Sequence, residues 1–275
     1  MTGPLGDPVL AGWRMDDQGT GHPVAFIEMA QASGLALVGG AEGNDALAAN
    51  TYGTGELIAL AHAEGAEEIT VFVGGSATTD GGLGAQRAMP LPPRLRSTSI
   101  TVGVDVETYF TDAAREFGPQ KGASPAQVQL LTRRLERLAG IYLEQYGVDV
   151  RDIPGTGAAG GLAGGLVAVG ATLASGFDVL AEAAHLDKAL DGVNLVVTGE
   201  GFCDANSFAG KVVGGVARWA QNADVPVLAV VGDTDLEPNE IPQHVRLVDL
   251  ASRFGLDQAL TDTEDLVATL VCATI

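Results

Sequence analysis

The sequence predicts an α/β fold built on parallel sheets. Three apolar runs, Val193–Thr198, Val225–Val231 and Val245–Leu250, alternate with segments of helical character. Strands that are apolar at nearly every position are typical of parallel sheets covered by helices on both faces. A further β-rich run, Ile69–Val73, leads into a glycine-rich turn. Open α/β sheets bind their ligands at such strand ends.

The other elements of the first half are short and bounded by turn residues. They are predicted strands at Pro8–Met15, Val24–Met29 and Ile100–Val106, and predicted helices at Gly55–Glu64, with Thr54 as its N-cap, and from Gly81 to about Arg87.

The clearest helix begins at Ser124-Pro125-Ala126-Gln127, which combines an N-cap, a first-turn proline and a capping-box glutamine. Apolar residues then recur at helical spacing until Gly147 ends the helix: Val128, Leu131, Leu135, Leu138 and Tyr142. This stripe is interpreted as core packing.

The C-terminal third adds helices near Ala209–Asn222, Gly255–Leu260 and Thr263–Cys272. The change to regular strand–helix alternation predicts a domain boundary near residue 185, giving domains 1–185 and 186–275.

Charge and cysteine content exclude several classes of partner. The net charge of −20 repels nucleic acid and anionic membrane surfaces, and no apolar run reaches the length that spans a bilayer. The two cysteines, Cys203 and Cys272, exclude a disulfide framework and favour a reducing, cytoplasmic location.

The turn after Ile69–Val73 has the sequence Gly74-Gly75-Ser76-Ala77-Thr78-Thr79-Asp80-Gly81-Gly82. Glycine backbone N–H groups can face an anion there, and Asp80 can hold a metal or accept a proton. A solvated turn residue or a helix N-cap is the alternative interpretation of Asp80.

A second acidic, glycine-rich segment follows the strand before Gly199. It has the sequence Gly199-Glu200-Gly201-Phe202-Cys203-Asp204, with Gly210-Lys211 shortly after. The two segments together indicate chemistry on a phosphate. Asp204 is alternatively a solvated turn residue or a helix N-cap.

Lysine is scarce in this chain, at positions 121, 188 and 211. Lys121 and Lys211 stand beside glycines in loop-like contexts, and a lysine is a compact charge suited to phosphate. The alternative is that each is an exposed loop residue.

The run Gly155-x-Gly157-x-x-Gly160 matches a dinucleotide fingerprint formally, but Pro154 stands where the preceding strand is required. We therefore reject a dinucleotide site. Two interpretations stay open: a Gly/Ala helix packed against neighbouring backbone, and an anion-binding helix N-terminus.

Five motifs, in order and at compatible spacing, resemble the bacterial glycerate kinases of type I over nearly the whole chain. They are Thr51–Ile58, Gly74–Gly82, Phe117–Gly122, Pro154–Gly161 and Val197–Gly201. The resemblance implies a flavodoxin-like parallel-sheet domain, incomplete here at its N-terminus, with a second α/β domain inserted into it. It implies transfer of the γ-phosphate of ATP to glycerate with Mg²⁺, with the C2 product favoured and a homodimer left open.

The resemblance also implies site residues. Ser76, Thr78 and the glycines Gly74, Gly75, Gly157, Gly160 and Gly199 would bind substrate or nucleotide. Asp80 or Asp204 would be the catalytic base, Glu200 would lie near Mg²⁺, and Lys121 and Lys211 would contact phosphate or the glycerate carboxylate. Which carboxylate is base and which is metal ligand stays open.

Three departures from the family pattern stand out. The family's opening segment does not precede Met1, the segment between Gly84 and Val102 is shorter, and Phe202 stands where the family usually has Arg. A non-catalytic relative that binds glycerate or nucleotide is therefore the first alternative. A Ser76 hydrolase is weaker, because Thr78 breaks the nucleophile-elbow pattern, and no cysteines or histidines have metal-ligand spacing.

Overall fold

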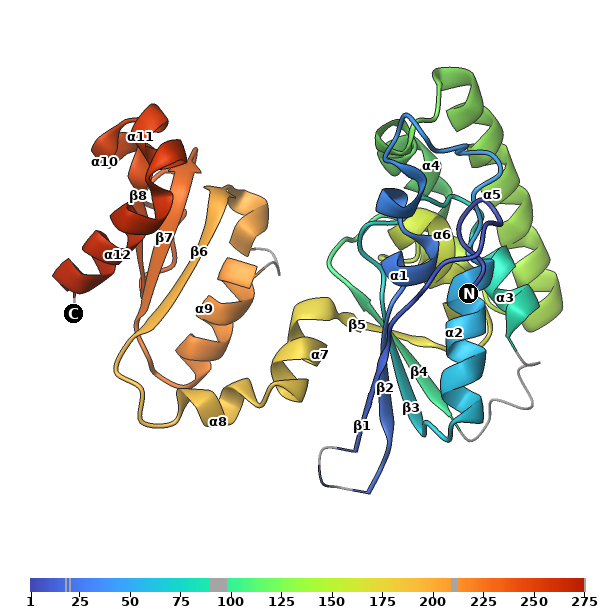
Figure 1. The fold of residues 1–275 in the computed structure, drawn as a ribbon, viewed down its shortest axis with the longest axis horizontal. Helices are drawn as coiled ribbons and strands as arrows, with labels where there is room; N and C mark the ends of the chain where they lie inside the picture. The colour runs from blue at the N-terminus through green and yellow to red at the C-terminus, as the bar shows by residue number, and fades with distance from the viewer. Residues whose placement is uncertain (18, 20, 90–97, 209–211, 275) are drawn as a thin grey trace. The chain divides into compact units, whose positions relative to one another are not determined.

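The computed structural model describes residues 1–17, 19, 21–89, 98–208 and 212–274. The chain divides into two compact units, Met1–Gly176 and Phe177–Ile275 (Figure 1). Both units are α/β, which confirms the predicted fold class. The division falls between Gly176 and Phe177, and the sequence pattern placed its boundary near residue 185.

The first unit contains a five-stranded sheet in the order β1-β2-β3-β4-β5. A short antiparallel strand, β1 (Arg14–Asp16), lies at one edge. The other four strands are parallel: β2 (Val24–Glu28), β3 (Glu68–Phe72), β4 (Ser99–Val104) and β5 (Thr172–Ser175). The carboxyl ends of β2–β5 therefore share one edge of the sheet, where β3 leads into the Gly74–Gly82 turn.

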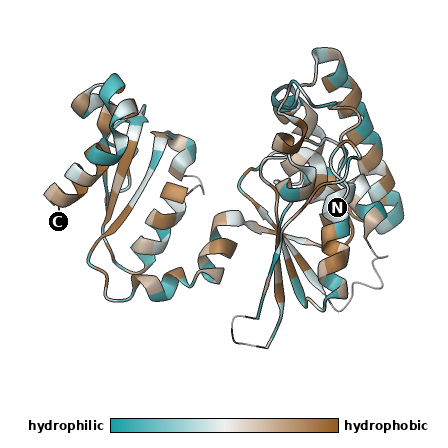
Figure 2. Ribbon diagram, viewed as in Figure 1, coloured by the Kyte–Doolittle hydropathy of each residue, from teal (hydrophilic) through white to brown (hydrophobic). Residues whose placement is uncertain are grey.

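The helices of this unit follow or connect the strands. They are α1 (Ala30–Ser33), α2 (Tyr52–Ala63), α3 (Leu83–Ala88), α4 (Ala113–Phe117), α5 (Pro125–Tyr146) and α6 (Ala158–Ala168), and α7 (Gly176–Ala183) begins at the unit's end. Leu57 of α2 and Leu162 of α6 belong to one buried cluster with Ile69 and Val71 of β3. Apolar residues concentrate on the strands and on the helix faces that pack there (Figure 2).

α5 forms as the sequence predicts. Ser124 and Gln127 make a capping box, and Gly147 ends the helix in the left-handed conformation at φ 73°. The stripe residues Leu131, Leu135 and Tyr142 are buried in a second core cluster of the same unit. All of these signals are local, which is why the sequence alone located them.

The second unit contains three parallel strands, β6 (Val196–Cys203), β7 (Val227–Thr234) and β8 (Val245–Asp249). Its helices are α8 (Leu186–Leu190), α9 (Val212–Asn222), α10 (Leu250–Phe254), α11 (Leu256–Thr261) and α12 (Thr263–Thr274). Val227 and Ala229 of β7 pack with α9, whereas Leu228 and Val230 pack with α10–α12. This alternation confirms a sheet covered on both faces.

Several element boundaries differ from the prediction. α2 begins at Tyr52 with Thr51 at the N-cap, so Thr54 is not its cap. Thr54 is instead buried, and its hydroxyl hydrogen-bonds that of Ser33 at 2.7 Å. The sequence contains two threonines three residues apart, and only tertiary contacts show which one precedes the helix.

The strand predicted at Pro8–Met15 is shorter, because β1 spans Arg14–Asp16 alone. β6 is longer than expected and continues through Gly199 and Glu200 to Cys203. The four-residue β5 carried no sequence signal that we recognised. Within the described part of the chain, no helix combines the length and apolarity needed to cross a membrane.

Candidate functional site

A cavity of about 440 Å³ opens at the carboxyl ends of β3 and β4 in the first unit. Gly74, Gly75 and Ser76 line it from the turn after β3, and Asp105 lines it just after β4. Lys121 closes another side. The cavity thus lies at the carboxyl ends of parallel strands, where open α/β sheets bind their ligands. Glycine backbone and a lysine lie together there.

Lys121 is buried, with 2 % of its surface exposed. It ends a 3-10 turn at Pro119–Lys121, and its ammonium donates a hydrogen bond to the Thr78 carbonyl oxygen at 2.8 Å. The Phe117 ring lies 6.0 Å from Nζ. Burial lowers the pKa of Lys121 to about 7, and the negative charge of Asp80 opposes this shift. The alternative of an exposed loop lysine is wrong for this residue.

Unpartnered polar atoms lie on Asn44 and on the glycine-rich turn, both of which contact the lysine. The Asn44 amide donates to the carbonyls of Ala77 and Lys121 at 2.9 and 2.8 Å, which ties the glycine-rich turn to the lysine turn. The Asn44 Oδ1 atom and the hydroxyls of Thr78 and Thr79 are buried without a hydrogen-bond partner. Such atoms are costly unless a water or ligand satisfies them, so this region is suited to polar chemistry.

Asp80 follows Thr78 and Thr79 in the turn, and its carboxylate accepts hydrogen bonds mainly from backbone N–H groups. Its Oδ2 atom accepts from the Thr51 N–H, the Thr51 hydroxyl and the Gly84 N–H, all within 3.0 Å, and Oδ1 accepts from the Gly82 N–H at 3.2 Å. Asp80 does not line the 440 Å³ cavity. These contacts make it a residue that fixes the turn and the start of α3.

Gly157 and Gly160 also lie outside the lining of this cavity. A Cβ atom on Gly157 would meet the Tyr109 carbonyl oxygen at 2.4 Å, and one on Gly160 would meet that of Thr78 at 2.0 Å. Both glycines therefore allow backbone to pack against backbone. Their neighbours Ala158 and Ala159 line the cavity, and Ala159 has the unusual φ of 53° for a non-glycine residue.

The second unit carries the other predicted residues. Gly199 and Glu200 lie within β6, and Oε1 of Glu200 is buried without a partner. Asp204 accepts a hydrogen bond from the Ser207 N–H at 3.0 Å and so caps a short 3-10 turn, Ala205–Phe208. Lys211 lies outside the described residues.

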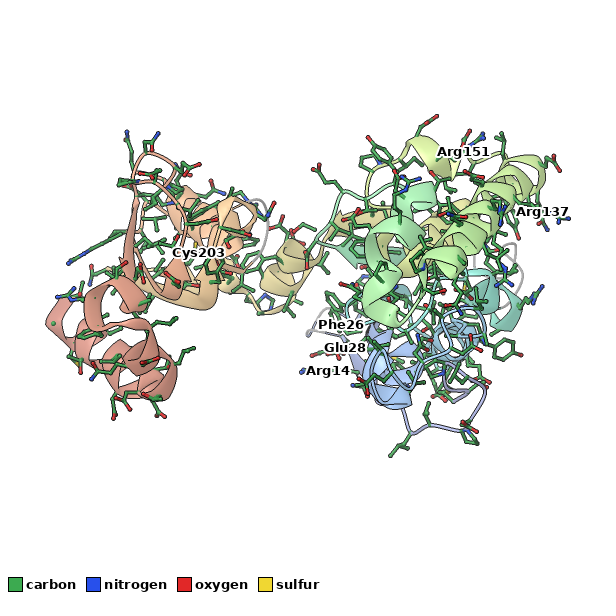
Figure 3. All side chains as sticks on the ribbon, turned by 90° about the horizontal axis from the view of Figure 1, so that it is seen from above. Arg14, Phe26, Glu28, Arg137, Arg151 and Cys203 are labelled. Atoms are coloured by element: carbon green, nitrogen blue, oxygen red, sulfur yellow. The ribbon has the colours of Figure 1, made fainter. Side chains whose placement is uncertain are left out.

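Cys203, labelled in Figure 3, ends β6 and is buried. Burial raises the pKa of its thiol to about 11, so it stays protonated at neutral pH. A thiol in that state is a poor nucleophile.

Asp105 is the residue that sequence reasoning missed. It lies at the end of the predicted strand Ile100–Val106, directly after β4 and at the same sheet edge as the Gly74–Gly82 turn. An acid at the end of a predicted strand is the signal that could have identified it. Its side chain is exposed on the cavity, and no other described group hydrogen-bonds its carboxylate. Among residues 1–17, 19, 21–89, 98–208 and 212–274, no three His, Cys, Asp or Glu side chains converge as a metal site.

Comparisons with known proteins assign the family. The model of the glycerate kinase family matches residues 1–91 and 88–274. A protein of Escherichia coli strain K12 named "Glycerate 2-kinase" is 36% identical, with 98% of this chain and 81% of that protein aligned. A Bacillus subtilis "Glycerate kinase" is also 36% identical, over 89% of this chain and 71% of its own.

A solved structure supports the same assignment. The crystal structure of a putative glycerate kinase 2 from Salmonella typhimurium LT2 superimposes with a TM-score of 0.74 and 32% identity, and covers 99% of this chain and 82% of its own. The family predicted from the sequence is confirmed. The chain belongs to the glycerate kinase family.

Proposed function

We propose that this chain phosphorylates D-glycerate with ATP and Mg²⁺, and that 2-phosphoglycerate is the product. The membership of the family and the names of its relatives support this activity. A cytoplasmic location and ATP and glycerate as ligands are parts of the same proposal.

The observation that carries the proposal is the buried Lys121 at a cavity lined by glycine backbone. An ammonium group in a poorly solvated site attracts an incoming anion more strongly than one in water. A bound carboxylate or phosphate would in turn favour the charged form of Lys121. We assign Lys121 the role of holding an anionic group of the substrate, with Gly74, Gly75 and Ser76 contributing N–H and hydroxyl donors.

The residues present also fit Mg²⁺. In kinases this ion is bound by one or two carboxylates together with substrate phosphates, so a three-ligand protein site is not required. Asp105 offers an exposed carboxylate at the first cavity, and Glu200 offers a buried oxygen without a partner in the second unit. Either could hold the ion, whose chemistry is to neutralise charge on the transferred phosphate.

For the base that receives the hydroxyl proton, we favour Asp105 over Asp80. A base needs a free lone pair directed at the substrate. Both oxygens of Asp80 already accept hydrogen bonds from its own protein, whereas the Asp105 carboxylate is exposed on the cavity. Asp204 remains a candidate, although it caps a turn.

Phosphorus NMR tests both the reaction and its product. The protein is incubated with ATP, MgCl₂ and D-glycerate, and 2-phosphoglycerate is expected to accumulate with ADP. Asp105→Asn is expected to lower kcat by at least about 100-fold, the usual range for a general base. The matched control is Asp112→Asn, which removes an exposed ion pair with Arg115 and should leave kcat within about twofold. Nucleotide binding without turnover would instead favour the non-catalytic relative.

A further inference from the structure

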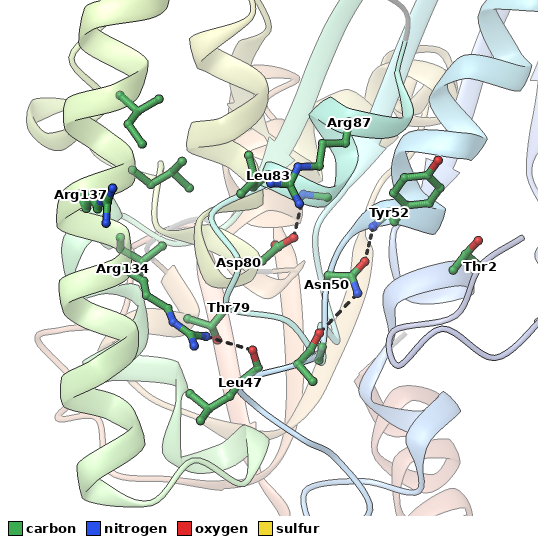
Figure 4. A pocket seen from close by; sticks show the side chains of 16 residues that line it. Thr2, Leu47, Asn50, Tyr52, Thr79, Asp80, Leu83, Arg87, Arg134 and Arg137 are labelled. Carbon is green, nitrogen blue, oxygen red and sulfur yellow. Dashed lines mark hydrogen bonds between the residues drawn. The ribbon is translucent and has the colours of Figure 1, made fainter.

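A second cavity, of about 730 Å³, lies within the first unit and shares no lining residue with the Lys121 cavity. α5 forms one side through Arg134 and Arg137, α3 contributes Arg87, and Tyr52 of α2 lies opposite α5 (Figure 4). All of its lining residues belong to the first unit, so the shape of the cavity does not depend on the second unit.

Three guanidinium groups gather around this cavity in a chain with twelve arginines and a net charge of −20. Arg134 donates a hydrogen bond to the Leu47 carbonyl at 3.1 Å. Within the described part of the chain, no carboxylate forms an ion pair with Arg87 or Arg137. Arg137 projects from α5 (Figure 3). Unpaired guanidinium groups at a concave surface favour an anion.

The floor of the cavity carries an unsatisfied donor. Thr79 is 2 % exposed, and its hydroxyl has no hydrogen-bond partner. Leaving such a group unpaired costs about 1–3 kcal/mol. Asp80, the acid beside it, is already satisfied by four donors of the protein, so it offers an incoming ligand little further hydrogen bonding.

The walls are apolar. Leu83, Leu135, Leu138 and Ile141 line the cavity between the floor and the arginines. A volume of this size lies in the range of small-molecule sites. Glycerate has no apolar surface to cover such walls, so this cavity does not suit the substrate.

We propose that this cavity is a second ligand site that binds an amphipathic anion. The ligand has an apolar body, which lies between the leucines, and a polar oxygen that accepts a hydrogen bond from the Thr79 hydroxyl. A carboxylate or phosphate at one end contacts Arg87, Arg134 and Arg137. Because Thr79 and Asp80 belong to the Gly74–Gly82 turn, a bound ligand stabilises the same turn that lines the Lys121 cavity.

Isothermal titration calorimetry on the full chain tests the site with 1-naphthyl phosphate and 1-naphthoate as probes. The wild type is expected to bind at least one of them. Inorganic phosphate alone should bind at least about tenfold more weakly, because it lacks the apolar body. Binding of the phosphate ester or of the carboxylate identifies which anion the site takes.

Two variants locate the probe. Arg134→Ala combined with Arg137→Ala is expected to weaken binding at least about tenfold. Ala48→Trp is expected to abolish binding, because Ala48 is an exposed residue of the lining whose enlargement fills the cavity. The matched control is Arg133→Ala, which removes the same charge from α5 but at a different cavity, and affinity should stay within about twofold.

Three results would overturn the proposal: no binding of either naphthyl probe, equal weakening by Arg133→Ala, or unchanged affinity in the Ala48→Trp variant. Circular dichroism of each variant shows that it is folded. None of these measurements depends on kinase activity. The proposed ligand site can therefore be disproved while the proposed kinase function stands, and the kinase function can be disproved while the ligand site stands.

Discussion

Lys121 has a buried amino group whose hydrogen-bond acceptor is a neutral carbonyl. Its pKa is lowered to about 7 by burial, against about 10.4 in an unfolded chain. Between these values the unfolded chain holds a proton that the folded chain has released. Lys121 therefore makes the free energy of unfolding smaller at neutral pH than at alkaline pH. Its contribution to that free energy rises with pH from about 7 to about 10.

We predict that the Lys121→Met variant loses this dependence. Urea unfolding followed by tryptophan fluorescence at pH 7 and pH 9 should show a rise in the free energy of unfolding that is larger in the wild type, with a limiting slope of about 1.4 kcal/mol per pH unit. Lys188→Met is the control, because Lys188 is exposed in α8. An equal pH dependence in wild type and Lys121→Met would contradict the burial argument.

Asp80 holds together the Gly74–Gly82 turn, Thr51 and the start of α3. Because three N–H or O–H donors converge on Oδ2, an asparagine must lose the charge and place either its oxygen or its NH₂ among them. We predict that Asp80→Asn lowers the free energy of unfolding by at least about 2 kcal/mol. Chemical denaturation measures this.

Asp45→Asn is the matched control for Asp80→Asn. Asp45 also caps backbone N–H groups, those of Leu47 and Ala48, but it is exposed, and asparagine is an equally good cap. Its cost should stay below about 0.5 kcal/mol. Equal costs at the two positions would show that Asp80 has no special structural role.

At this scale, sequence reasoning identified Lys121 because lysine is rare in the chain and this one lies beside glycine. It did not foresee the burial of Lys121, because Asn44, Ala77 and Thr78 enclose the lysine from segments distant in sequence. The role of Asp80 as an acceptor for Thr51 was hidden for the same reason.

α6 is a helix whose first turn is shaped by glycine. Gly160 and Gly161 have φ values of 66° and 88°, and Gly160 accepts a hydrogen bond from the Gly81 N–H at 3.0 Å. The carbonyl of Thr78 occupies the space where a side chain on Gly160 would begin. This contact agrees with one of the two interpretations of the glycine-rich run that begins at Gly155, namely a Gly/Ala helix packed against neighbouring backbone.

Gly160→Ala should therefore destabilise the protein by more than about 3 kcal/mol, because it combines a left-handed backbone with a steric overlap at 2.0 Å. Gly140→Ala is its counterpart in the interior of α5, where a Cβ meets nothing within 4 Å. That substitution should stabilise by about 0.5–1 kcal/mol. Thermal denaturation of the two variants measures both changes in stability. A loss of stability below about 1 kcal/mol in Gly160→Ala would contradict the close packing at Gly160.

Elements with local signals were predictable, and elements that depend on distant contacts were not. The ends of α5 are set by Ser124, Gln127 and Gly147, all within the element or beside it. By contrast, β6 continues past Gly199 because β7 pairs with it as far as Cys203. Glycine lowers the strand propensity of this segment, but the hydrogen bonds to β7 keep Gly199 and Gly201 in the strand.

The whole molecule consists of two units, each with its own hydrophobic clusters. The buried clusters of the first unit end at Ala171, and those of the second include Val213 and Leu228. Each unit also contains one tryptophan, Trp13 and Trp219. Each tryptophan can therefore report on the unfolding of one unit.

We predict that Leu228→Ala lowers the stability of the second unit by about 2–5 kcal/mol, the range for a buried leucine. Trp219 fluorescence in a Trp13→Phe background should report this loss. Trp13 fluorescence in a Trp219→Phe background should give an unchanged midpoint. A shift of both midpoints by the same amount would mean that the units unfold as one.

The buried Lys121 is the residue on which we propose that glycerate phosphorylation depends. The most direct test of this proposal is the initial rate of ADP release with ATP, Mg²⁺ and D-glycerate, in the wild type and in Lys121→Met, with Lys188→Met as the control. We expect glycerate-dependent ADP release that falls at least about 100-fold in Lys121→Met and is unchanged in Lys188→Met. An active Lys121→Met protein, or no glycerate-dependent release from the wild type, would contradict it.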